Sequence, residues 1–143
     1  MLATSERIEI LDQVDYLANM ILNSDFAAQY RICLYNLKSN KETQRKIRQF
    51  VQLKDLYEDV QRFGKYHPDY KRVMKEVRVA KREMDLDPNV AEFKIAENDL
   101  QGLLDEISVL IGGAVSENIK VPTGNPFFET SHSCGSGGGC GHH

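Results

Sequence analysis

The chain has 143 residues, a length that suits one domain with a modest core. Its hydrophobic content of 41% and charged content of 27% are ordinary for a soluble globular protein. The formal net charge of -3 excludes a protein that binds nucleic acid through its overall charge. Because the sequence has no run of 18 apolar residues and no signal-peptide pattern, we expect no membrane insertion and a cytoplasmic location.

Apolar residues recur with a helical spacing along most of the chain, and no stretch is typical of a strand. The spacing predicts five helices, at about 5–23, 24–37, 41–63, 68–84 and 88–119. Residues that start or stop helices mark these boundaries, namely Ser24, Asn40 and Asp87 as caps, Pro68 and Pro88 in first turns, and Gly64 as a stop. The sequence therefore predicts an all-α fold.

Each of the first two predicted helices carries one apolar stripe. The first stripe consists of Leu11, Val14, Leu17, Ala18 and Ile21, and the second of Phe26, Tyr30, Cys33, Leu34 and Leu37. Buried cysteines usually pack as small hydrophobic residues, so we expect Cys33 in the core rather than as a ligand.

The third and fourth helices are predicted to form a long antiparallel hairpin. Their apolar residues recur by three and four, as in a coiled-coil seam: Leu53, Leu56, Val60 and Phe63, then Tyr70, Val73, Val77, Ala80 and Met84. The connection GKYHPDY is short, which favours antiparallel neighbours. His67 in this connection is expected to be a turn or cap residue.

The fifth helix is the longest and carries a wide apolar seam. The residues of this seam are Phe93, Ala96, Leu100, Leu103, Ile107, Leu110 and Ala114. Gly102, Gly112 and Gly113 cost stability inside a helix and indicate either a close approach of another segment or fraying. The apolar stripes exceed what one thin chain can bury, so we expect a homo-oligomer or a hetero-complex formed through the fifth helix or the hairpin.

The composition changes after Lys120. We therefore expect a helical domain over 1–120 and a flexible glycine- and cysteine-containing tail over 121–143. No P-loop, dinucleotide loop, nucleophile elbow or other catalytic set occurs, so the sequence predicts a protein that is not an enzyme.

The stretch KRVMKEVRVAKR carries a local excess of positive charge. Its candidate interaction residues are Lys71, Arg72, Lys75 and Arg78. These side chains could contact RNA phosphates, but aromatic residues that would stack on bases are sparse. A solvated helix face or the acidic surface of a protein partner is the favoured interpretation.

Two cysteines in the tail, Cys134 and Cys140, are separated by five residues, four of which are glycine. Glycine permits almost any turn, so both sulfur atoms could face one metal ion or cluster. Thiolates favour zinc, copper(I) or iron–sulfur centres, and zinc sites and clusters typically take four ligands. Either His132 or His142 completes a small zinc site, or other chains supply the remaining ligands, or the tail is inert. His142 and His143 could also belong to a purification tag.

The sequence resembles the YlbF/YmcA family of Gram-positive bacteria. The resemblance is carried by LYEDVQRFGKYHPDYKRVMKEVRVAKREMDLDPNVAEFKIAENDLQGLLDEISVLI, IKVPTGNPFF and the ending CGSGGGCG. It implies an all-helical regulatory subunit of a complex with YmcA-like and YaaT-like proteins.

The same resemblance implies that this complex carries [4Fe-4S] clusters and modulates RNase Y-dependent mRNA processing, with effects on competence, sporulation and biofilm formation. The implied cluster ligands in this chain are Cys134 and Cys140, shared with cysteines of the partners.

Overall fold

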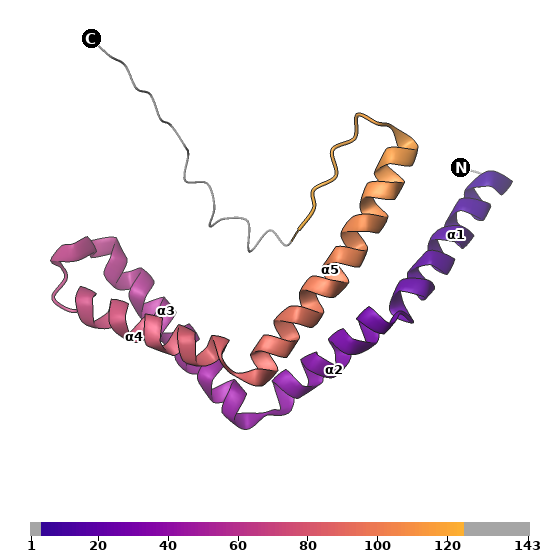
Figure 1. Ribbon diagram of the computed structural model, residues 1–143. Coiled ribbons are helices and arrows are strands. Elements are labelled where there is room, and N and C mark those ends of the chain that lie inside the picture. The colour runs from indigo at the N-terminus through magenta and orange to yellow at the C-terminus, as the bar shows by residue number, and fades with distance from the viewer. Residues whose placement is uncertain (1–3, 125–143) are drawn as a thin grey trace, which may run out of the picture. The chain divides into compact units, whose positions relative to one another are not determined.

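The computed structural model describes residues 4–124 and forms five α-helices in that range (Figure 1). The helices are α1 (Ser5–Leu22), α2 (Asp25–Ser39), α3 (Lys41–Phe63), α4 (Tyr70–Asp85) and α5 (Pro88–Val115), with a 3-10 turn, η1, at Gly64–Tyr66. No strand occurs among these residues, so the predicted all-α fold of five helices is confirmed.

Local sequence signals set most of the helix boundaries. Ser24 Oγ accepts a hydrogen bond of 3.2 Å from the amide of Ala27 at the start of α2. Asn40 Oδ1 accepts two bonds of 3.0 Å from amides in the first turn of α3. Gly64 ends α3 with a φ of 67°, a conformation that favours glycine. The predicted roles of these three residues are confirmed.

The start of α4 differs from the prediction by two residues. The sequence predicts Pro68 in the first turn, but α4 begins at Tyr70. His67 shapes the connection, because its Nδ1 accepts a bond of 3.1 Å from the Asp69 amide and its carbonyl accepts one of 3.1 Å from the Tyr70 amide. His67 is therefore the predicted turn residue, and Pro68 lies inside the turn rather than in the helix.

Helices α3 and α4 lie side by side as the predicted antiparallel hairpin (Figure 1). The predicted seam of α4 is confirmed, since Val73 and Ala80 are buried and the other three members are half-buried. The predicted seam of α3 is only partly right. Val60 is buried, whereas Leu56 and Phe63 are 42% and 71% exposed.

The buried face of α3 keeps a spacing of three and four residues, but some of its members differ from the predicted ones. Half-buried Phe50, Leu53 and Tyr57 lead to buried Val60 along this face. Tyr57 thus occupies the position that the apolar spacing assigns to Leu56.

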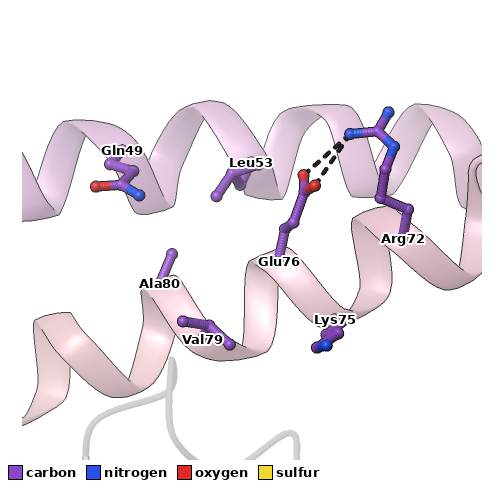
Figure 2. Close-up of a pocket in the computed structure, with 7 residues that line it drawn as sticks. All are labelled: Gln49, Leu53, Arg72, Lys75, Glu76, Val79 and Ala80. Atoms are coloured by element: carbon purple, nitrogen blue, oxygen red, sulfur yellow. Dashed lines mark hydrogen bonds and ion pairs between the residues drawn. The ribbon is translucent and has the colours of Figure 1, made fainter.

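A groove of about 560 Å³ runs along one side of the hairpin. Gln49 and Leu53 of α3 line it opposite Val79 and Ala80 of α4 (Figure 2). Its remaining lining residues are Arg72, Lys75 and Glu76. The groove therefore has an apolar floor and a charged edge.

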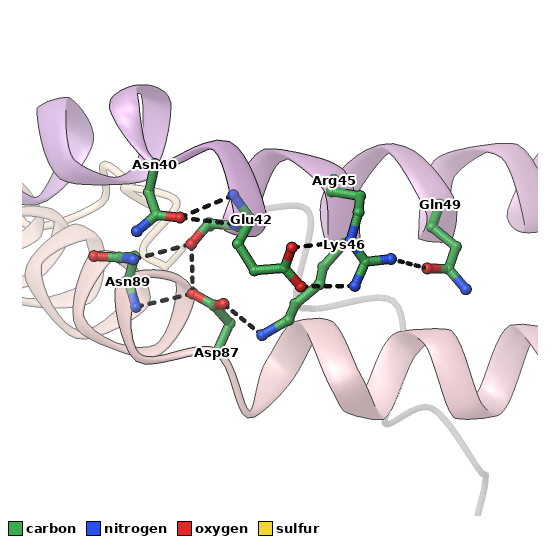
Figure 3. Close-up of polar contacts among 8 residues, drawn as sticks. Asn40, Glu42, Arg45, Lys46, Gln49, Asp87 and Asn89 are labelled. Atoms are coloured by element: carbon green, nitrogen blue, oxygen red, sulfur yellow. Dashed lines mark hydrogen bonds and ion pairs between the residues drawn. The ribbon is translucent and has the colours of Figure 1, made fainter.

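A buried polar junction joins α3 to the turn before α5 (Figure 3). Thr43 Oγ1 donates a bond of 2.8 Å to Asp87 Oδ1, and Lys46 Nζ lies 2.8 Å from Asp87 Oδ2. Asp87 Oδ1 also accepts a bond of 3.1 Å from the Asn89 amide, as expected of the cap of α5. Burial disfavours the charged carboxylate, but the bonds from Lys46 and Thr43 outweigh it and lower the pKa of Asp87.

The start of α5 also packs against α2 through apolar side chains. The rings of Tyr30 and Phe93 have centroids 5.4 Å apart. Cys33 is 2% exposed, and its Sγ accepts a bond of 3.4 Å from Gln29 Nε2. The prediction that Cys33 is a core residue is confirmed.

The chain divides into two units, Met1–Leu100 and Gln101–His143, and the division falls within α5. The predicted boundary between a domain at 1–120 and a tail at 121–143 stays a prediction, because only four residues of that tail are described. None of the helices within 4–124 has both the length and the apolar character needed to cross a membrane.

In the second unit, residues 116–124 turn back along α5, and we call them the return segment (Figure 1). The Gly124 amide donates a bond of 2.7 Å to Asp105 Oδ2. A Cβ atom at Gly112 would lie 2.5 Å from Val121 Cγ2. Of the three glycines in α5, only Gly112 has a neighbour this close, so the close approach expected from the sequence is that of the return segment.

Candidate interaction surfaces

Helix α1 is largely exposed, with only Leu17 and Ile21 half-buried. None of its 18 residues is buried, and its large apolar side chains include Leu11 and Val14, at 63% and 54% exposure. An isolated helix of this length is marginal in water, because most helices in proteins are stabilised by packing of an apolar face. The exposed stripe of α1 is therefore a surface on which another helix could pack.

The sequence predicted the apolar stripe of α1 but not that this stripe stays open to a partner. Contact with other chains was instead predicted for the fifth helix or the hairpin. The missed signal is the number of apolar residues outside the stripe. The additional exposed side chains are Ile8, Ile10, Tyr16, Met20 and Leu22. A helix this apolar that buries none of these side chains is typical of an interface.

The second apolar surface is the C-terminal half of α5. Four residues of the predicted seam lie here and are the candidates for assembly: Leu100, Leu103 and Ile107 are half-buried, and Leu110 is 72% exposed. Val115 at the end of the helix is also 72% exposed. The structure thus places these residues along one helix, and their role in assembly stays a prediction.

A groove of about 400 Å³ lies where the return segment meets α5. Its lining residues are Asp105, Glu106, Val109, Leu110 and Thr123. Asp105 and Gly112 are seven residues apart, which places them two turns apart on the same face of the helix. Asp105 accepts a hydrogen bond from the return segment, and Gly112 leaves room for it. An acceptor and a glycine seven residues apart are therefore the feature of the sequence that points to this contact.

The predicted cluster ligands Cys134 and Cys140 lie outside the described residues, as do His132, His142 and His143. Within residues 4–124 no three His, Cys, Asp or Glu side chains gather closely enough to hold a metal ion. The described residues therefore do not form a metal site by themselves.

The structure separates Arg72 from the other predicted residues of the basic stretch. Arg72 lies 3.1 Å from Glu76 and 3.2 Å from Asp69, and hydrogen bonds to these carboxylates raise the pKa of Arg72. Lys71, Lys75 and Arg78 are exposed and make no such pair within the described residues. Positive charge that is not neutralised by neighbouring carboxylates thus remains on one side of α4.

The family described as control of competence regulator ComK, YlbF/YmcA, matches residues 10–116. The regulatory protein YlbF of Bacillus subtilis is 53% identical over 145 residues, covering 99% of this chain and 97% of that protein. A chain in the crystal structure of Bacillus subtilis RicA in complex with RicF has a TM-score of 0.72 and 51% identity, over 79% of this chain and 98% of that chain. The chain belongs to the YlbF/YmcA family.

Proposed function

We propose that this chain is a regulatory subunit that acts by assembling with other proteins and has no catalytic activity of its own. The observation that carries the proposal is α1, an 18-residue helix with an apolar stripe and no buried residue. The relative YlbF is named a regulatory protein, and the similar solved chain comes from a complex of two proteins, RicA and RicF. The name of the relative supports a regulatory role, and the solved complex supports a role in assembly.

The partners that we propose are YmcA-like and YaaT-like proteins, with the chain forming a homo-oligomer when it is alone. The assembled complex would modulate RNase Y-dependent mRNA processing and so affect competence, sporulation and biofilm formation. The family description, which refers to control of the competence regulator ComK, supports the competence part of this proposal.

We further propose that Cys134 and Cys140 hold a [4Fe-4S] cluster together with cysteines of the partners. A bound cluster would supply an iron–sulfur centre that usually takes four cysteine thiolates. This chain alone does not fit such a cluster, because Cys33 is buried in the core and the described residues offer no other group of ligands. Zinc held by the two cysteines and His132 or His142 is the alternative.

The assembly proposal is tested by replacing Leu11 with Asp and measuring co-purification with the YmcA-like and YaaT-like proteins. A carboxylate in the packed interface would cost about 2 kcal/mol or more, so we expect recovery of the partners to fall at least tenfold. Gln13→Asp is the control, because Gln13 is exposed and polar and lies about 160° from Leu11 on α1. Equal recovery with both variants would refute the role of the α1 stripe.

The cluster proposal has a separate readout. The three proteins are co-purified without oxygen, and the visible absorption of the complex is compared with that of the Cys134→Ser/Cys140→Ser variant. We expect the variant to lose the iron–sulfur absorption while still binding its partners. Unchanged absorption would refute the ligand assignment and leave the assembly proposal standing, and metal analysis distinguishes iron from zinc.

A further inference from the structure

Four exposed cations form a single line on α4. Lys71, Lys75, Arg78 and Arg82 recur at spacings of four, three and four residues. At 3.6 residues per turn they fall within about 60° of one another. The buried residues Val73 and Ala80 lie on the opposite side of the helix. We call these four cations the basic stripe.

Many of the cations in the described residues have carboxylate partners, whereas the four of the stripe do not. Seven cations lie within 4.0 Å of a carboxylate: Arg45, Lys46, Lys54, Arg62, Arg72, Lys81 and Lys94. None of the four stripe side chains makes an ion pair or hydrogen bond within the described residues. The acid next to the stripe, Asp85, is already paired with Lys81 and Lys94 at 2.6 Å each.

The chemistry of the stripe differs from that of a protein interface. The centres of interfaces between proteins are depleted in Lys and enriched in aromatic residues, Met and Arg, and the stripe has two Lys and no aromatic residue. The surface of α1 has this apolar character, but the stripe consists of charged side chains only. Contacts to phosphates need Lys and Arg without an apolar centre. The contrast favours a phosphate-bearing partner over an acidic protein.

The dimensions of the stripe and its neighbouring groove fit a nucleic-acid strand. The stripe is about 16 Å long at 1.5 Å per residue, and each of its four cations could contact one phosphate of an extended strand. Lys75 belongs both to the stripe and to the groove of about 560 Å³ (Figure 2). The apolar floor formed by Leu53, Val79 and Ala80 could cover one face of an unstacked base.

We infer that the basic stripe binds the phosphates of single-stranded nucleic acid, with the adjacent groove receiving a base. The net charge of -3 does not oppose this, because the stripe is a local concentration of unpaired positive charge. Binding through phosphates would be independent of base sequence and would weaken steeply with salt. This site lies on a different helix from the apolar stripe of α1, so it does not depend on the assembly described above.

The test uses the full chain and a fluorescent single-stranded RNA of about 20 uridines, with binding followed by anisotropy. Four phosphate contacts predict a slope of about -2.8 in a plot of log affinity against log salt concentration. The affinity should therefore fall roughly fiftyfold between 50 and 200 mM salt. We expect Lys71→Gln/Lys75→Gln/Arg78→Gln/Arg82→Gln to lose at least tenfold in affinity at 50 mM and most of the salt slope. An oligothymidine of the same length should bind within about threefold of the RNA.

The matched control removes four cations that also make no ion pair among the described residues: Lys38→Gln, Lys41→Gln, Arg48→Gln and Lys120→Gln. Each quadruple variant changes the formal net charge from -3 to -7, so a difference between them reports position and not total charge. Far-UV circular dichroism checks that both remain folded. No RNA binding at 50 mM salt, or an equal loss in both variants, would overturn the inference. Intact RNA binding with lost capture of protein partners in the stripe variant would also overturn it, in favour of an acidic protein surface.

Discussion

Thr43 Oγ1 donates a hydrogen bond of 2.8 Å to Asp87 Oδ1, across 44 residues of sequence, and both side chains are buried. Thr43 lies in the first turn of α3, and Asp87 immediately precedes α5. Because α3 and α4 form the hairpin between them, this bond closes the hairpin at the end opposite to its turn. Asn89 Nδ2 adds a bond of 2.9 Å to Thr43 Oγ1 and satisfies the hydroxyl further.

Asp87→Ala should destabilise the fold by about 3 kcal/mol. The change leaves Lys46 half-buried without its anion and removes the cap of α5. Urea denaturation followed by circular dichroism measures the loss. The control is Glu42→Gln, which breaks the exposed pair with Arg45 on the same turn of α3 and should change stability little. If both variants lost a similar free energy of unfolding, the buried junction around Asp87 would contribute no more than an exposed ion pair.

Stability should decrease on acidification because of Asp87. Its pKa is lowered in the folded state from 3.8, so the unfolded chain takes up a proton first as the pH falls. The contribution of this carboxylate is complete above about pH 5 and is lost as the pH falls below 3.8 toward the lower pKa of the folded state. Denaturation at a series of pH values should show a shallower acid slope for Asp87→Asn than for the unmodified chain. Asp85, whose pKa is also lowered, contributes equally to the acid slopes of the variant and the unmodified chain. Identical slopes would show that Asp87 does not contribute to the loss of stability in acid.

Gly112→Ala should release the return segment while leaving the helical body folded. Its new methyl group would meet Val121 Cγ2 at 2.5 Å, so Val121 has to move away from α5. Gly113→Ala is the control, because nothing lies within 4 Å of a Cβ there and alanine should add up to about 1 kcal/mol of helix stability. Hydrogen exchange of the Gly124 amide, which is bonded to Asp105, should become at least tenfold faster in Gly112→Ala only. Equal exchange rates of the Gly124 amide in the two variants would show that the close approach of Val121 to Gly112 does not hold the return segment on α5.

Two substitutions on one face of α5 should have different effects. Leu103→Asp should lower the stability of the fold, whereas Leu110→Asp should weaken assembly. Leu103 is half-buried, so a carboxylate there should lower stability by about 1–3 kcal/mol. Leu110 is 72% exposed, so Leu110→Asp should leave the melting temperature unchanged and reduce the oligomer or complex measured by light scattering. An unchanged melting temperature for Leu103→Asp would place the apolar seam of α5 elsewhere.

Most boundaries of the helices could be predicted closely because local chemistry determines them, whereas α4 begins two residues later than predicted and α5 ends at Val115 instead of near residue 119. Ser24, Asn40 and Asp87 satisfy free amides of the following helices, and Gly64 adopts the positive φ that ends α3. The face that a helix buries was harder to predict, because apolarity alone does not reveal contact. Phe63 is as apolar as Val60, yet it is 71% exposed where Val60 is 4% exposed.

The surfaces were predicted less well than the helices. Gly112 signalled a close approach, but only the coordinates identify Val121 as the neighbour, since the contact depends on how the chain turns after Val115. The availability of α1 depends on which stripes the rest of the chain covers, and its signal in the sequence is the number of apolar residues outside its own stripe. The positive charge of α4 was visible, whereas the pairing of Arg72 with Glu76 depends on the geometry of the folded helix.

The return segment also determines how far the tail cysteines can reach. The bond from Gly124 to Asp105 fixes the chain about 15 Å back from the end of α5, at 1.5 Å per residue over the ten residues to Val115. From Gly124, the ten residues to Cys134 can extend at most about 35 Å. Release of residues 116–124 would lengthen this tether by about 30 Å. In the proposed assembly, docking of nine residues on α5 would therefore set the radius within which a partner presents its cysteines.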